Sequence, residues 1–254
     1  MNEKQQIWTE SYKIASYLVN MKNKAGLYSI LNLVQDVGWL HGIHLQVQLP
    51  KNQNWVFTRQ KLTMQKWPAW NETVTIQTWL RPPVGKFLFR DYEIFLGDSL
   101  TGQKIGICTS TLAIMDLQTR KIVDIEWKAD EKIWRKSGHL LQTPEKIMID
   151  QPLQQLAQFE VRNSDLDMNL HVNNTKYSQW ILDAVALDII QSDIAVTDYE
   201  VNFLAEAKKG DVIKLQKTDD HPLKDSIIQF QGVRSSDNKP VFVAQLRILK
   251  AGSA

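Results

Sequence analysis

The chain of 254 residues has a single cysteine, Cys108, and so cannot form a disulfide framework within one chain. Residues 1–8 (MNEKQQIW) lack the basic stretch and apolar core of a secretory signal, and also the long leader rich in Ser and Arg of organelle transit peptides. No stretch reaches the ~18–20 uninterrupted apolar residues of a membrane span. Even residues 180–190 (WILDAVALDII) contain Asp183 and Asp188. We therefore expect a cytoplasmic protein that does not enter the membrane.

Charge of one sign is not in excess either. Lys plus Arg number 30 and Asp plus Glu number 28, and charged residues make up 23% of the chain against 43% for apolar ones. These values are close to the averages for ordinary domains and argue against a nucleic-acid partner. The length allows one large domain or two of about 120 residues each, and either can bury a core that needs no disulfide or metal. We expect a soluble globular protein.

The same order of periodic segments occurs in both halves of the chain. The first half has an alternating run at residues 8–19, then apolar residues at helical spacing from Leu27 to Val37. Four more strand-like runs follow, at residues 56–63, 73–81, 87–96 and 104–115. The second half has a run near residues 159–162 and a helix over 174–190. Its four later runs are at residues 196–204, 211–217, 226–233 and 241–249.

This repeat predicts an α+β fold that duplicates one unit. The second helix is apolar on most sides, which is what a helix wrapped by a curved sheet shows. A curved antiparallel sheet around one long helix is the hot-dog arrangement, so two in tandem make a double hot dog. We expect an N-terminal hot dog at residues 1–127, a partly helical connector at 128–155 and a C-terminal hot dog at 156–254.

Residues 163–180 (NSDLDMNLHVNNTKYSQW) place four Asn, two Asp and one His in front of the second helix. In an extended or loop-like backbone, the i, i+2, i+4 spacing of Asp167, Asn169 and His171 sends all three side chains to one side. The N–H groups of a helix's first turn have no intrahelical partner and can bind a developing oxyanion. A carboxylate, an amide, an imidazole and such a helix start are the groups needed for attack on a carbonyl carbon.

A purely structural alternative is that these Asp and Asn residues turn the chain and cap the helix. We assign that role mainly to Asn173 and Asn174, one of which we expect to be the helix cap. The cluster of Asp167, Asn169 and His171 combines three chemistries at one helix entrance, and we expect it to be functional.

Residues 165–182 (DLDMNLHVNNTKYSQWIL) resemble the signature of the acyl-ACP thioesterases, Asp-x-Asn-x-His-Val-Asn-Asn followed by Lys-Tyr and a Trp. In the first half, residues 54–80 (NWVFTRQKLTMQKWPAWNETVTIQTWL) resemble the same family's Trp-Val-x-x-Arg and Tyr/Trp-Pro-x-Trp stretch. The resemblance runs through both halves. It implies a double hot-dog hydrolase that releases long-chain fatty acid from acyl carrier protein (ACP) and so terminates fatty acid synthesis.

By position, the resemblance implies catalytic roles for four residues: Asp167, Asn169, His171 and Glu206. Glu206 matches the family's catalytic Glu on the strand after the helix, in the setting FLAE. From the residues alone, the alternative for Glu206 is a solvated strand end. Plant members have a Cys after this Glu, and Ala207 here excludes a Cys-His-Asn mechanism at this site. We interpret Cys108 as a small buried hydrophobic residue within a strand.

These roles imply hydrolysis of a thioester by water, without a metal or an organic cofactor. His171 and Glu206 would bind and deprotonate the water as general base, and Asn169 would position the water or the carbonyl. N–H groups at the helix start would stabilise the tetrahedral oxyanion. Asp167 either orients and charges this network or attacks directly to form a transient anhydride, and both alternatives are open.

The first half lacks this cluster, and at its own helix it offers only Gln35, Asp36 and residues 41–44 (HGIH). We infer that this half supplies walls of an acyl pocket, with ordinary core as the alternative for each candidate. The candidates are Leu31, Val34, Gly38, Trp39, Trp55 and Phe57. His41 and His44 have no carboxylate or Cys at ligand spacing, so we expect no metal site.

An acyl carrier protein is strongly acidic, so a basic patch near the mouth of the site is expected. The candidates are Lys128, Lys132, Arg135 and Lys136. They alternate with Asp130 and Glu131, and the alternative is that they form a solvated helix face. Two other functions are open: an acyl-CoA thioesterase and a non-catalytic acyl-binding module. Chain-length preference and oligomeric state are open too, with a homodimer as one option.

Overall fold

The computed structural model describes residues 6–46, 48–125, 133–185, 194–218 and 226–250. The chain divides into two compact units, Met1–Pro144 (unit 1) and Glu145–Ala254 (unit 2). In the ranges described, no helix has both the length and the apolar character needed to cross a membrane.

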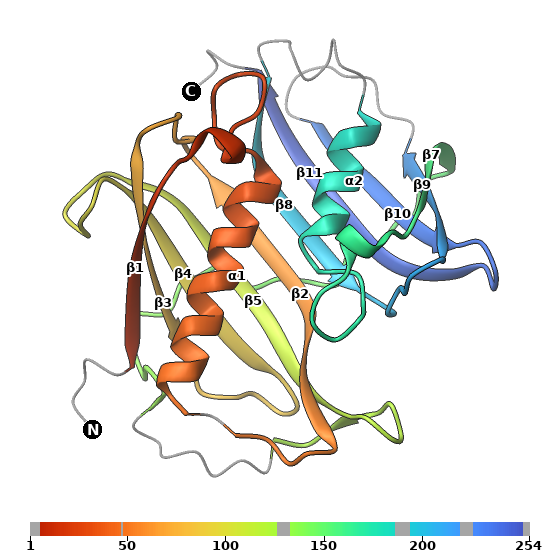
Figure 1. Cartoon of the computed structure of the whole chain (residues 1–254), viewed down its shortest axis with the longest axis horizontal. Coiled ribbons are helices and arrows are strands. Elements are labelled where there is room, and N and C mark those ends of the chain that lie inside the picture. Colours follow the sequence, from red (N-terminus) through yellow and green to blue (C-terminus); the bar gives the residue numbers. More distant parts are fainter. Residues whose placement is uncertain (1–5, 47, 126–132, 186–193, 219–225, 251–254) are drawn as a thin grey trace. The chain divides into compact units, whose positions relative to one another are not determined.

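Unit 1 is an antiparallel sheet with one long helix, α1 (Leu27–His44), along one face (Figure 1). Its strand order is β1-β3-β4-β5-β2, and β6 pairs with β5. The strands are β1 (Ile7–Lys13), β2 (Gln53–Met64), β3 (Thr73–Leu80), β4 (Leu88–Leu96), β5 (Lys104–Asp116) and β6 (Ile122–Val123). A short 3-10 helix, Ser16–Leu18, follows β1.

Helix α1 forms where the apolar spacing predicts it. Its most buried side chains, none more than 3% exposed, are Leu27, Ile30, Leu31, Val34 and Val37. These positions repeat at three and four residues, so they lie on one face and pack against the sheet. A Cβ at Gly38 would lie only 2.6 Å from the Tyr92 hydroxyl of β4. Glycine at this position therefore allows α1 to approach β4 closely.

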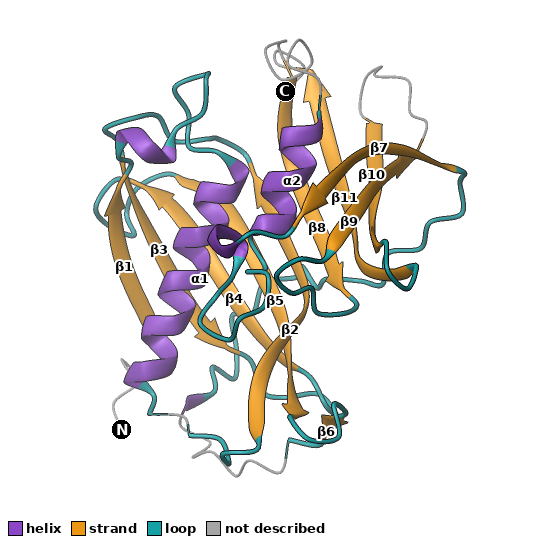
Figure 2. Ribbon diagram, turned by 45° about the vertical axis from the view of Figure 1, so that its right-hand side comes forward, coloured by secondary structure: helices purple, strands orange, loops and turns teal. Residues whose placement is uncertain are grey.

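Unit 2 repeats this arrangement, with helix α2 (Lys176–Ala184) against a second antiparallel sheet (Figure 2). The strands are β7 (Leu153–Glu160), β8 (Ile194–Phe203), β9 (Val212–Thr218), β10 (Ser226–Arg234) and β11 (Lys239–Lys250). Their order, β8-β11-β10-β9-β7, is that of unit 1 read from the other end. In both sheets the first strand of the unit pairs with the third, and the duplication predicted from the sequence is confirmed.

Three segments differ from their predicted bounds. Strand β1 ends at Lys13, and the residues up to 19 form a 3-10 helix and a turn. Strand β7 begins at Leu153, because this edge strand has no buried residue and so no clear alternation of buried and exposed positions. Helix α2 ends at Ala184, and Val185 is extended with ψ 135°. Residues 186–190 of the predicted helix lie outside the described residues.

Of the connector predicted to be partly helical, Ile133 is in a 3-10 helix, residues 134–152 contain no helix, and residues 128–132 lie outside the described residues. In unit 1, strand side chains bind its backbone. The Leu140 N–H donates to the buried Asp91 carboxylate (3.1 Å), and Arg81 donates to the Leu140 carbonyl (3.0 Å) while pairing with Asp91 (2.6 Å). These partners replace the intrahelical hydrogen bonds that a helix would make.

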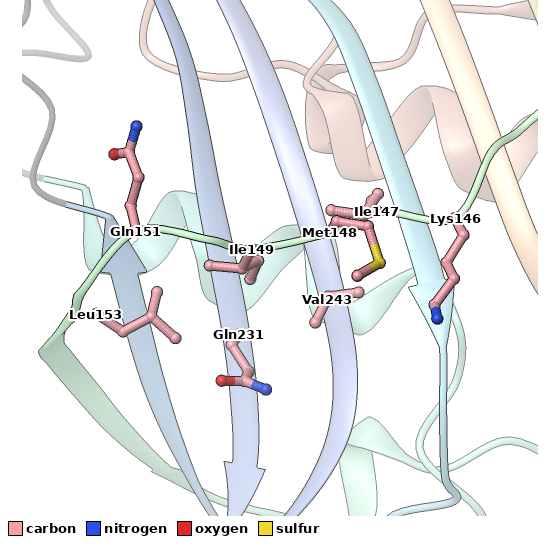
Figure 3. Close-up of a pocket in the computed structure, with 8 residues that line it drawn as sticks. All are labelled: Lys146, Ile147, Met148, Ile149, Gln151, Leu153, Gln231 and Val243. Atoms are coloured by element: carbon pink, nitrogen blue, oxygen red, sulfur yellow. The ribbon is translucent and has the colours of Figure 1, made fainter.

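In unit 2, the connector crosses the face of the sheet opposite α2 (Figure 3). Glu200 and Asn202 of β8 point to that face and accept the N–H groups of Glu145 (2.6 Å) and Ile147 (2.8 Å). The residues that alternate with them point to α2, as the contact of Phe203 with the helix shows. Strand β8 thus binds the connector on one face and α2 on the other.

Candidate active site

The polar segment before α2 is a tight turn. Leu166 and Val172 form an isolated β-bridge at its base, and the Asp167 N–H donates to the His171 carbonyl (2.8 Å). The Leu170 N–H donates back to the Asp167 carbonyl (3.0 Å). Leu170 adopts φ 61°, in the left-handed region that residues other than Gly, Asn and Asp seldom occupy. Because the backbone turns here, the two-residue alternation of an extended chain does not determine where these side chains point.

Asp167 holds the shape of this turn. Its Oδ1 atom accepts the N–H of Asn169 (2.8 Å) and the N–H of His171 (3.3 Å). Asn169 lies exposed at the tip of the turn. The carboxylate therefore fixes the backbone of both other residues of the predicted cluster, which is an orienting role.

Unit 1 contains the same turn before α1, with different side chains. Val19 and Ala25 form the bridge, the Asn20 N–H donates to the Lys24 carbonyl (2.8 Å), and Asn23 has φ 55°. The Asn20 amide oxygen accepts the N–H groups of Lys22 (2.9 Å) and Lys24 (3.4 Å). The unit 1 counterpart of the cluster thus precedes α1. At the positions of Asp167, Asn169 and His171 it has Asn20, Lys22 and Lys24, so this turn lacks the Asp, Asn and His of the cluster.

His171 and Glu206 come together across two loops. His171 Nε2 lies 3.3 Å from Glu206 Oε2, and the two side chains are 25% and 27% exposed. Glu206 lies in the loop after β8, which ends at Phe203, and the Val172 N–H donates to the Ala207 carbonyl (2.9 Å). An imidazole and a carboxylate are thus held at hydrogen-bond range, half-buried but reachable by water.

Arg234, at the end of β10, supports the Glu206 loop. Its Nη1 atom donates to the Glu206 carbonyl (2.9 Å) and lies 3.5 Å from Asp211 Oδ2. Asp211 in turn accepts the Lys208 N–H (2.9 Å), and Asp237 binds the other side of the guanidinium (2.9 Å). One guanidinium thus joins two loops to the strand end and fixes the backbone that carries the carboxylate.

Tyr177 in the first turn of α2 lies beside the pair. Burial raises the pKa of the Tyr177 hydroxyl, and the negative charge of Glu206 raises it further. Its ring packs against Phe203 (5.8 Å between ring centroids), Phe242 (4.7 Å) and Trp180 (5.4 Å). The start of α2 is therefore packed in an aromatic cluster with the ends of β8 and β11.

The start of α2 differs slightly from the prediction. The N-cap position is Thr175, and the expected cap Asn173 acts two residues earlier. The Asn173 amide oxygen accepts the Thr175 N–H (3.1 Å), and the Asn173 carbonyl accepts the Lys176 N–H (2.9 Å). These two amides are therefore occupied within the chain, and oxyanion binding at this helix start would use other groups.

Asp165, Tyr177 and Arg234 are site residues that sequence reasoning missed. Asp165 is 8% exposed, and it accepts the Arg162 N–H (2.8 Å) while its carbonyl accepts the Asn173 N–H (2.8 Å). Its position three residues after Arg162, at the end of a strand, is a local turn signal that could have identified it. Arg234 has no such signal, because its partner Glu206 is 28 residues away.

The predicted acyl-pocket residues of unit 1 fall into three groups. Leu31 and Val34 are core residues of α1. Trp55 and Phe57 pack against a buried cluster of three strand residues and two connector residues: Leu80, Leu88, Leu112, Ile133 and Trp134. Trp39 is 56% exposed and lies at the surface.

His41 is buried against Arg90 of β4. His41 Nδ1 lies 2.7 Å from Arg90 Nη1. Because a guanidinium only donates, His41 Nδ1 accepts, so the proton of the neutral ring is on Nε2. His44 packs on Trp8 (4.5 Å between ring centroids). Among the described residues, no group of three or more His, Cys, Asp or Glu side chains is placed to hold a metal ion.

Of the predicted basic patch, Lys128 and Lys132 lie outside the described residues, as do Asp130 and Glu131. The Arg135 guanidinium stacks over the ring of Trp79 (4.3 Å). A shallow cavity of about 310 Å³ lies beneath the connector of unit 2 (Figure 3). Its apolar lining comes from Ile147, Met148, Ile149, Leu153 and Val243, and none of its lining residues belongs to the site.

Comparison with known proteins gives a family for both units. Residues 5–132 match the acyl-ACP thioesterase N-terminal domain, and residues 150–243 match the acyl-ACP thioesterase C-terminal domain. The chain belongs to the acyl-ACP thioesterase family. It is 28% identical over 230 residues to oleoyl-acyl carrier protein thioesterase 1, chloroplastic, of Arabidopsis thaliana, a match that covers 81% of this chain and 62% of the relative.

A second Arabidopsis thaliana relative, oleoyl-acyl carrier protein thioesterase 2, is 28% identical over 85% of this chain and 64% of its own length. The chain thus spans less than two thirds of these curated relatives. Two solved structures share the fold over nearly the whole chain. An acyl-ACP thioesterase from Bacteroides thetaiotaomicron has a TM-score of 0.83 at 21% identity, covering 98% of this chain and 100% of that one. The 12:0-ACP thioesterase from Umbellularia californica has a TM-score of 0.79 at 20% identity, covering 96% of this chain and 98% of that one. The predicted α+β double hot-dog fold is confirmed.

Proposed function

We propose that this protein hydrolyses the thioester of a long-chain acyl-ACP to free fatty acid and ACP, the step that ends fatty acid synthesis. The observation that carries the proposal is the pair of His171 Nε2 and Glu206 Oε2, 3.3 Å apart beside the start of α2. Family membership supports it, because the curated relatives are named as thioesterases of acyl carrier protein.

In the proposed reaction, His171 and Glu206 act as the general base. They take a proton from a bound water while its oxygen forms a bond to the thioester carbonyl carbon. The tetrahedral intermediate then collapses, the C–S bond breaks, and the leaving thiolate takes up the proton. The products are a carboxylic acid and the thiol of ACP, so no oxidant or further reactant is needed.

The other two predicted residues have supporting roles in this scheme. Asn169, exposed at the tip of the turn, positions the water or the carbonyl oxygen. Asp167 accepts the N–H groups of Asn169 and His171 and so keeps both in place. The oxyanion is stabilised by donors other than the Thr175 and Lys176 amides, which Asn173 already occupies.

A thiol-trapping assay on acyl-ACP tests the proposal. Wild type is compared with His171→Ala and Glu206→Gln, and each variant is first checked by circular dichroism and thermal melting. Loss of a general base lowers kcat by roughly 10²–10⁴-fold, and we expect this in both variants. Lys24→Ala is the matched control, since Lys24 has the place of His171 in the turn of unit 1, and it should retain the wild-type rate.

Three outcomes would change the conclusion. Equal rates in wild type, His171→Ala and Glu206→Gln would remove these residues from the reaction. A higher kcat/KM on acyl-CoA than on acyl-ACP with the same acyl chain would replace the carrier protein by coenzyme A as the proposed substrate. If no thioester yields free thiol, the acyl-binding alternative replaces hydrolysis.

A further inference from the structure

Two exposed lysines follow the Glu206 loop directly. Lys208 and Lys209 are exposed, and within the described part of the chain neither side chain forms an ion pair. The residue before them, Ala207, accepts the Val172 N–H (2.9 Å), so the lysines are joined to the turn that carries His171. Two positive charges therefore lie at the edge of the proposed active site.

Neighbouring carboxylates form no ion pair with the side chains of these two lysines. Asp211 and Asp237 both face the guanidinium of Arg234, at 3.5 and 2.9 Å. At the end of β7, the exposed Glu160 and Arg162 are one acid and one base, so they offset each other. Counting Arg234 with its two carboxylates, these residues leave one positive charge in excess, and it is carried by lysines whose side chains form no ion pair among the described residues.

Apolar side chains are exposed on the turn that carries His171. Leu170 is 71% exposed and Met168 is 76% exposed, on either side of Asn169. The counterpart of Leu170 in the turn of unit 1 is Asn23, at nearly the same φ (55° against 61°). Asn tolerates the left-handed conformation, whereas a branched side chain is strained there. Folding alone therefore favours Asn at position 170, and an exposed Leu in its place is suited to contact another molecule.

We propose that Met168, Leu170, Lys208 and Lys209 form the docking surface for the acyl carrier protein. This inference rests on the proposed function and adds where the carrier binds. Protein interfaces commonly have an apolar centre and a charged rim, and charge complementarity steers the partner into place. An acidic carrier seated here holds its thioester beside His171 and Glu206, whereas a small thioester has no protein surface to make these contacts.

The test compares kcat/KM for one acyl chain on three carriers: ACP, 4′-phosphopantetheine and coenzyme A. The ratio of the ACP value to the phosphopantetheine value reports docking and is insensitive to partial unfolding. In the double variant Lys208→Glu/Lys209→Glu, we expect this ratio to fall by about tenfold or more, and the salt dependence of the ACP reaction to weaken. The charge-matched control is Lys146→Glu/Lys217→Glu. It alters exposed or half-exposed lysines on the connector and near the far end of β9, and should keep the wild-type ratio.

A second variant, Leu170→Asn, separates docking from folding. The substitution introduces Asn, the residue at the corresponding position 23 of unit 1, so the melting temperature should equal or exceed that of wild type. The ratio of kcat/KM on ACP to kcat/KM on phosphopantetheine should fall by about fivefold. An unchanged ratio in both variants would overturn the docking proposal while leaving hydrolysis intact. Equal losses on ACP, phosphopantetheine and coenzyme A would also overturn it, because the lysines would then bind the phosphate of the arm. Absence of hydrolysis in wild type would instead reject the proposed function.

Discussion

Replacing Asp167 by Asn separates an orienting role from a nucleophilic one. Asp167 Oδ1 accepts two backbone N–H groups, at 2.8 and 3.3 Å. In the repeated turn of unit 1, the amide oxygen of Asn20 accepts the corresponding N–H groups at 2.9 and 3.4 Å. The protein itself therefore contains the Asn version of this turn, and Asp167→Asn should keep its geometry. Asp167→Ala removes the acceptor from both N–H groups.

The magnitude follows from these two hydrogen bonds. A hydrogen bond to a charged group contributes about 1.5–3 kcal/mol and one between neutral groups about 0.5–1.5 kcal/mol. The turn is partly exposed and the second bond is long. We therefore expect Asp167→Asn to lose about 1 kcal/mol of transition-state stabilisation, which lowers kcat roughly fivefold to tenfold. Asp167→Ala should lose about 2–3 kcal/mol, or roughly a hundredfold.

The assay is thiol release from acyl-ACP, with thermal melts of each variant. Because the orienting role needs only an acceptor at Oδ1, the Asn variant should remain far more active than the Ala variant. If Asp167→Asn and Asp167→Ala are equally inactive, with rates down by about 10⁴-fold or more, the orienting role is refuted. Direct attack by the carboxylate then becomes the mechanism.

Three further predictions concern stability and reactivity. Cys108 is fully buried and burial raises the pKa of its thiol, so alkylation should be slow in the folded protein and fast after denaturation; rapid labelling of the folded protein would contradict this. In Gly232→Ala the added Cβ would meet the Phe242 ring, and thermal melting should show a loss of about 1–3 kcal/mol. In Gly42→Ala the added Cβ lies in open space on α1, so the free energy of unfolding should rise by about 0.5–1 kcal/mol. Equal changes in stability for Gly232→Ala and Gly42→Ala would refute the packing argument. Asn202→Ala removes the acceptor of a connector N–H and should make the connector more sensitive to limited proteolysis; an unchanged cleavage rate would show that this contact does not secure it.

Periodicity predicted the repeated fold because most strands have one face on a helix or connector and alternate accordingly. It missed the start of β7, an edge strand with no buried residue. Residues 134–152 of the connector also form no helix, although their mixed charges are compatible with one. The buried side chains of Asp91 and Glu200 bind its backbone instead, and no local pattern reveals such distant partners.

The sequence predicted only part of the candidate site. Spacing brought Asp167 and His171 into one segment, and in the observed turn the His171 N–H donates to the Asp167 carboxylate at 3.3 Å. Glu206 was found through family resemblance, since its own neighbourhood indicates only a solvated strand end. Arg234, which fixes the Glu206 carbonyl, lies on another strand and was not found. Contacts between distant strands depend on register, which one sequence does not state.

The repeated turn also separates what the fold requires from what the proposed chemistry requires. Both turns need a side-chain oxygen at the first position, Asn20 or Asp167, because it accepts the same two N–H groups. The next two polar positions are free to vary, since unit 1 has Lys22 and Lys24 there with the same backbone. The shared backbone of the two turns therefore does not require His171. A residue that the repeated backbone does not require is a stronger candidate for a functional role than one that it does.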